Sequence, residues 1–158
     1  MSTKTIFRGL IEHLATNLPG GLVDTVVRYD GDAEAAIEEH IVALPDGTGA
    51  TILVGFTATQ YDGRSVGGSY SIGQMPVTIL AVQRRHEVTS DSQQVAMVQA
   101  AEALDDIADA IVTLLAGNPR ALSGSGVAVI AVNEIVGLLG GGDWLGRALT
   151  CSAVLIPS

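Results

Sequence analysis

The amino-terminal segment carries apolar side chains at helical spacing. Neighbouring members of the set lie one, three or four residues apart, which places them on one face of an α-helix. The set is Ile6, Phe7, Leu10, Ile11, Leu14 and Leu18. Ser2 or Thr3 can cap this helix. Pro19-Gly20-Gly21 ends it, because proline cannot continue the backbone ladder and glycine readily leaves helical geometry.

A second apolar stripe predicts a longer helix. Its members are Met97, Ala101, Leu104, Ala108, Ile111 and Leu115. Ser90 with Gln93, or Asp91 with Gln94, has the spacing of a capping box at its start. Gly117-Asn118-Pro119 stops it. A helix of about 25 residues is about 38 Å long, which is enough to cross a whole sheet.

Other segments have the composition and alternation of β-strands. They are residues 22–29, 50–59, 76–87, 127–139 and 145–156. Residues 140–143 (GGGD) are typical of a hairpin turn, and the Gly- and Ser-rich residues 61–73 predict a long hairpin arm or loop. Residues 32–43 fit either a short helix capped by Asp32 or a further strand.

This order of elements predicts one α+β domain over residues 1–158. We expect a mostly antiparallel or mixed sheet, since hairpin turns favour antiparallel pairing. The N-terminal helix and the long helix are expected to pack on one face of that sheet.

Composition and charge exclude several classes of protein. The formal net charge is −9, which argues against specific nucleic-acid binding, since that needs clustered basic residues. The single cysteine, Cys151, excludes an internal disulfide and a cysteine-based zinc site. It shares one face of a predicted strand with Leu149, Ala153 and Leu155, which favours a packed, inert thiol. We expect no signal peptide and no membrane-spanning segment.

Motifs that resemble catalytic or metal-binding sequences lack the context such chemistry needs. Residues 63–67 (GRSVG) match a nucleophile elbow, but a Gly/Ser loop follows and no acid lies between Ser65 and His86. Residues 105–109 (DDIAD) are better explained as the solvated face of the long helix. The acidic residues at 30–34 suit a helix-capping turn, and the histidines lack ligand spacing. We therefore expect no catalytic, cofactor-binding or metal-binding residues.

Four segments resemble the Mu-like prophage tail-protein family, which is similar to the tail-terminator proteins of long-tailed phages. They are residues 50–61 (ATILVGFTATQY), 74–85 (QMPVTILAVQRR), the long helix with its Gly-Asn-Pro stop, and 144–156 (WLGRALTCSAVLI). The resemblance implies a small, non-catalytic α+β protein of the virion tail, assembled in the host cytoplasm. Such proteins form a ring, usually of six copies, that ends the tail tube and offers a surface to the head–tail connector protein.

If the resemblance holds, the partners are further copies of this chain, the tail tube protein and the connector. The expected interface elements are the arm at 61–73, the basic strand end Arg84-Arg85-His86 and the glycine turn. The residues assigned to the subunit or tube interface are Tyr61, Arg64, Tyr70, Gln74, Arg84, Arg85, His86, Asp143 and Trp144. For Arg84-Arg85-His86, salt bridges to the acidic face of the long helix are an alternative to contacts with a partner. A small-molecule-binding domain or a small enzyme of unknown reaction is the alternative function.

Overall fold

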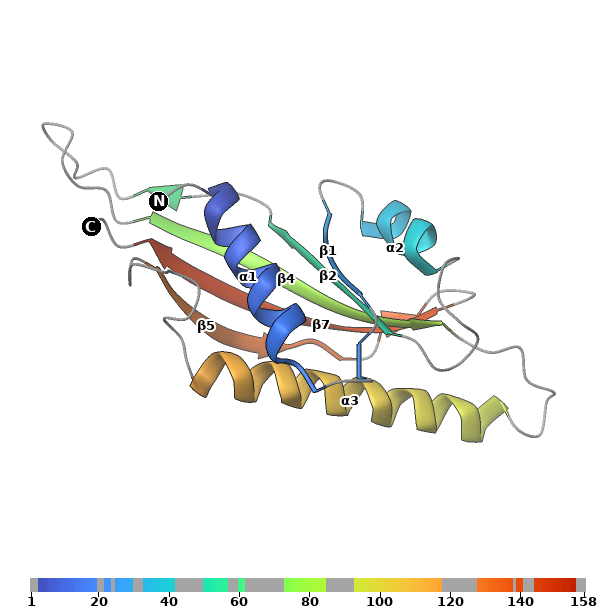
Figure 1. Ribbon diagram of the computed structural model, residues 1–158. Coiled ribbons are helices and arrows are strands. Elements are labelled where there is room, and N and C mark those ends of the chain that lie inside the picture. Colours follow the sequence, from blue (N-terminus) through green and yellow to red (C-terminus); the bar gives the residue numbers. More distant parts are fainter. Residues whose placement is uncertain are drawn as a thin grey trace, which may run out of the picture.

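The structure is a computed structural model that describes residues 3–19, 22–23, 25–29, 33–41, 50–56, 60–61, 73–84, 93–117, 128–137, 139–140 and 144–155. Helices and strands follow one another along this chain (Figure 1). Their bounds are α1 Thr3–Asn17, β1 Thr25–Arg28, α2 Ala33–Ile41, β2 Ala50–Phe56, β3 Gln60–Tyr61, β4 Gly73–Arg84, α3 Gln93–Gly117, β5 Ala128–Ile135, β6 Leu139–Gly140 and β7 Trp144–Leu155.

One mixed sheet forms the centre of this α+β domain. Its strand order is β1-β2-β4-β7-β5, with β3 paired with β4 and β6 paired with β7. All 12 residues of β4 are in antiparallel register with β7, from Gly73 opposite Leu155 to Arg84 opposite Trp144. The pair β1 and β2 is parallel, because the chain between them passes through α2 and returns to the same end of the sheet.

Helices α1 and α3 cover one face of the sheet, which we call the α1–α3 face. Inward side chains of the central strands, such as Ile52, Ile79 and Leu149, are fully buried there. Leu10 and Leu14 of α1 belong to the same cluster. So do residues of the predicted stripe of α3: Leu104, Ala108, Ile111 and Leu115. The predicted packing of these two helices on one face is therefore confirmed.

The opposite face, which we call the α2 face, has a smaller core. Ile37 of α2 packs there on Leu53, Leu80, Val82 and Ala148 of the central strands. Residues 33–41 are thus helical, which decides between the helix and the strand that the sequence left open. Figure 1 shows α2 at one end of the sheet, whereas α3 runs along most of its length.

Several predicted strand boundaries were wrong by a few residues. The strand expected over 127–139 ends at Ile135, after a register shift between Val132 and Glu134. Of the described residues that follow, 139–140 resume pairing as β6. The strand expected to begin at Pro76 begins at Gly73, and Tyr61, expected in the arm, pairs with Gly73 as part of β3. Residues 62–72 of the arm lie outside the described residues.

Tyr29 and Gly55 make a close contact on the α2 face. A Cβ atom added to Gly55 would lie 2.5 Å from Cζ of Tyr29, so only glycine leaves room for the ring. Burial raises the pKa of the Tyr29 hydroxyl from its ordinary value of 10.0. The backbone N–H of Tyr29 donates to the carbonyl of Val54 at 3.0 Å, which fixes the chain at this contact.

We expect Gly55→Ala to lower the free energy of unfolding by about 1–3 kcal/mol, since the added methyl group displaces the Tyr29 ring from its packed position. Urea denaturation measures the change. Gly117→Ala is the matched control, because a Cβ there meets nothing within 4 Å, and it should leave stability unchanged or raise it slightly. An equal loss in both variants would contradict the contact.

Candidate functional site

The predicted interface residues that the structure describes lie at two ends of β4. At one end, Gln74 pairs with Gln60, next to Tyr61. At the other end, Arg84 pairs with Trp144. The two ends are about 34 Å apart, since ten residues of extended strand separate Gln74 from Arg84. The remaining predicted residues, Arg64, Tyr70, Arg85, His86 and Asp143, lie outside the described residues. The predicted set therefore belongs to two separate surfaces, not to one patch.

Trp144 is half-buried at its end of the sheet. It packs against the core of the α2 face, and its Cζ3 atom lies 3.0 Å from the position of a Cβ on Gly146. Leu80 also borders that glycine. Part of the indole therefore stabilises the fold, and the rest of the ring is not covered by the described residues.

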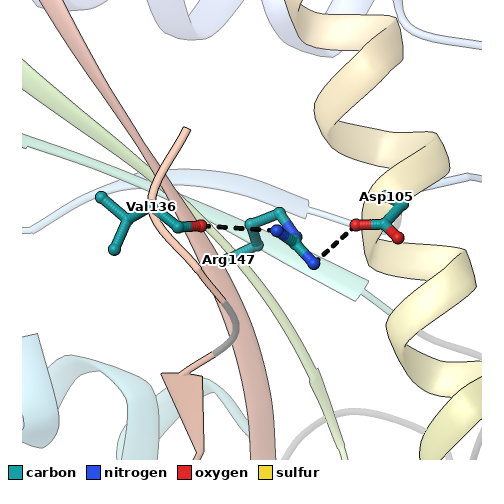
Figure 2. A network of polar contacts seen from close by, with 3 residues as sticks. All are labelled: Asp105, Val136 and Arg147. Atoms are coloured by element: carbon teal, nitrogen blue, oxygen red, sulfur yellow. Dashed lines mark hydrogen bonds and ion pairs between the residues drawn. The ribbon is translucent and has the colours of Figure 1, made fainter. Parts of the chain in front are cut away.

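Arg147 joins α3 to the sheet at the same end (Figure 2). Its Nη2 atom lies 2.6 Å from Oδ1 of Asp105, and Nη1 donates to the Val136 carbonyl at 3.5 Å. The Arg147 side chain is 19% exposed and that of Asp105 is 51% exposed. The guanidinium therefore spans β7, the segment after β5, and the middle of α3.

The sequence did not indicate this ion pair. The sequence offers Arg84-Arg85-His86 as one possible basic partner of the acidic helix face, whereas the ion pair that the structure describes comes from Arg147. A signal was present, because the alternation Leu145, Arg147, Leu149 puts one basic side chain among apolar ones on the inner face of β7. Contacts of Arg85 and His86 lie outside the described residues.

Two buried polar atoms near this ion pair have no hydrogen-bond partner among the described residues. They are Nε of Arg147 and Oε1 of Gln83. Arg147 is opposite Ala81, and Gln83 follows two residues later on the same face of β4, so the two side chains are diagonal neighbours. A donor and an acceptor thus lie on neighbouring strands, each without a partner among the described residues.

The aspartates of α3 are exposed, including Asp105, which flanks the helix face that meets the sheet. Asp105, Asp106 and Asp109 are exposed, as expected for the solvated face of an amphipathic helix. Within the described ranges, no three acidic, histidine or cysteine side chains are grouped closely enough to hold a metal ion. His13 on α1 contacts Asn17, whose Nδ2 lies 3.1 Å from Nδ1 of the imidazole.

Cys151 is buried in the core of the α1–α3 face, as the sequence predicted. It is 2% exposed, and burial raises the pKa of its thiol from 9.0 to about 12. The folded state therefore holds a proton that the unfolded chain releases above about pH 9. The buried, protonated thiol therefore contributes its full share to the free energy of unfolding below about pH 9, and this share is lost as the pH rises toward 12.

None of the described helices is both long enough and apolar enough to cross a membrane. Comparison with models of known protein families and with curated protein sequences found no match to this chain.

We expect Asp105→Asn to lower the free energy of unfolding by about 1 kcal/mol, because Arg147 loses the carboxylate that balances its partly buried charge. Asp106→Asn is the matched control, since Asp106 is exposed on the next position of the same helix. It should change stability by less than about 0.5 kcal/mol. Denaturation at low and at high salt measures both. Equal losses in the two variants would show that the ion pair contributes nothing.

We expect Cys151 to react with an aromatic disulfide reagent at pH 8 only after denaturant unfolds the chain. The thiol is both buried and protonated at that pH, and the thiolate is the reactive form. Absorbance of the released thiol measures the reaction. Rapid labelling of the native protein would contradict the packing of β7.

Proposed function

We propose that this chain is a non-catalytic structural protein of a phage or prophage tail. In this proposal, copies of the chain form a ring that ends the tail tube and joins it to the head connector. The ring has six copies if the chain follows the family that it resembles.

The observation that carries the proposal is the spatial arrangement of the resembling segments. Residues 50–61, 74–85 and 144–156 contain β2, β4 and β7, which are neighbours in the sheet. The long helix, the fourth resembling segment, packs on these same strands. The resemblance therefore covers one continuous structural unit, and not fragments scattered over the molecule.

The two ends of β4 suit a protein with two different neighbours. One end carries Tyr61 and Gln74, and the other carries Arg84 and Trp144. A ring at the junction of tube and connector contacts one partner on each side, so we assign one end to each. The net charge of −9 also suits a passage for DNA, because like charges repel.

A second candidate function is a small-molecule-binding domain or a small enzyme of unknown reaction. The observation in its favour is the unpartnered pair of Arg147 Nε and Gln83 Oε1. A small polar ligand with both a donor and an acceptor would satisfy the two atoms. A deep pocket and a bound ligand would favour this candidate over the tail protein.

The test of the first proposal is tube capping. Purified tail-tube protein of the same phage or prophage is polymerised with and without this chain, and tube lengths are measured by electron microscopy. We expect the full chain to limit tube length. Tubes of unchanged length, at all ratios of the two proteins, would contradict the proposed function.

We further expect that replacing residues 62–72 with a short Gly/Asn turn abolishes capping and leaves the fold intact. The replacement is feasible because β3 and β4 are already paired across this segment, with Tyr61 opposite Gly73, so a short turn can close the hairpin. The control carries Glu38→Ala and Glu39→Ala on the exposed side of α2 and should cap normally. If the shortened variant also caps normally, the arm is not an interface.

A further inference from the structure

The two edges of the sheet are β1 and β5. Among the strands that the structure describes, β1 pairs only with β2, and β5 pairs only with β7. An edge strand directs backbone N–H and C=O groups away from its sheet, and such groups can pair with another extended chain. Figure 1 shows the two strands on opposite sides of the molecule.

The edge strands run in opposite directions. β1 is parallel to β2, β2 is antiparallel to β4, and both the β4–β7 and β7–β5 pairs are antiparallel. Following these pairings across the sheet, β5 runs opposite to β1. If a second copy is placed beside the first in the same orientation, its β1 is antiparallel to the β5 of the first copy. Antiparallel pairing is the more stable kind of ladder.

The first half of β5 lacks the features that usually protect an edge. Soluble proteins blunt exposed edges with charges, prolines or bulges. Residues 128–132 (AVIAV) contain neither a charge nor a proline, and the irregularity and Glu134 come only after Val132. Ile135 at the end of this strand is 42% exposed. The unprotected stretch is five residues long and β1 has four, so the stretch can span the whole of β1.

We propose that β5 of one copy pairs with β1 of the next, head to tail, so that the sheet continues from subunit to subunit. A two-fold dimer through β5 would leave β1 unpaired, whereas head-to-tail pairing satisfies both edges and generates a ring when the rotation closes. The inference rests on the ring of the proposed function but not on its role in a tail. The partner is thus a second copy of this chain.

The proposal places two exposed residues of neighbouring copies near each other. Thr25 of β1 and Ala131 of β5 are both exposed. Thr25 is opposite Thr51 and Ala131 is opposite Ser152, which puts both on the α2 face, since Val26 and Val132 pack on the other. A continuous sheet keeps them on the same side of the joint.

The test uses two variants, Thr25→Cys and Ala131→Cys, each of which adds one cysteine to the native Cys151. They are coexpressed with different tags and treated with a short bismaleimide. We expect a cross-linked dimer that carries both tags, and no cross-link from either variant expressed alone. The native Cys151 does not compete, because it is buried and its thiol pKa is about 12. The wild-type chain, treated with the same reagent, measures any cross-linking through Cys151.

A further variant tests the same subunit interface without a cross-linking reagent. We expect Ala131→Lys to reduce the assembly to monomers while the far-UV circular dichroism spectrum of the folded chain stays unchanged, because a charged side chain on an edge opposes pairing. Thr113→Lys, on the exposed side of α3, is the control and should assemble normally.

The outcomes distinguish a failure of the proposed β5–β1 interface from a failure of the proposed function. A cross-link within Ala131→Cys alone would replace the head-to-tail joint with a two-fold one. Suppose that the wild-type chain forms a ring, but the two cysteine variants give no mixed cross-link and Ala131→Lys still assembles. The edge pairing is then wrong, and the ring itself is not contradicted. A wild-type chain that stays monomeric and gives no cross-link would overturn both.

Discussion

The 12-residue antiparallel pairing of β4 with β7 is the interaction on which the rest of the structure depends. It places apolar side chains on both faces of the sheet, such as Ile79 on one and Leu80 on the other. Both faces must therefore be covered, and the length of the strands determines what can cover them. α3 has 25 residues and is about 38 Å long, so it covers the α1–α3 face along the strands. The smaller core of the α2 face needs only a short helix.

The same pairing explains where an assembly can form. Because β4 and β7 occupy the centre, every additional strand is added outward, and the sheet ends in β1 and β5 with opposite directions. The long central strands also separate the predicted interface residues into two ends. A domain with two complementary edges and two distinct ends can join copies sideways and hold different partners above and below. This geometry is the physical basis for both the proposed tail ring and the proposed joint between subunits.

Local patterns in the sequence predicted most of the fold. The stripe from Leu104 to Leu115 and the Gly-Asn-Pro stop located α3, and alternation located Cys151 in the core. What local patterns could not predict depends on contacts between distant segments. The choice of a helix for residues 33–41 follows from the apolar α2 face of the sheet, and the pairing of Arg147 with Asp105 joins residues on separate elements. For the candidate site, the sequence predicted individual interface residues. The register of β4 with β3 and β7 was needed to show that these residues lie at opposite ends of β4.

The mass of the chain in solution tests the central claim, self-assembly into a closed ring, most directly. Light scattering after size exclusion, over a concentration series, measures it without any partner. The account predicts a discrete species of about 97 kDa, which is six copies of the 16.2 kDa chain. A species of 16.2 kDa at every concentration would contradict it, because the proposed pairing of β5 with β1 would then have failed to form.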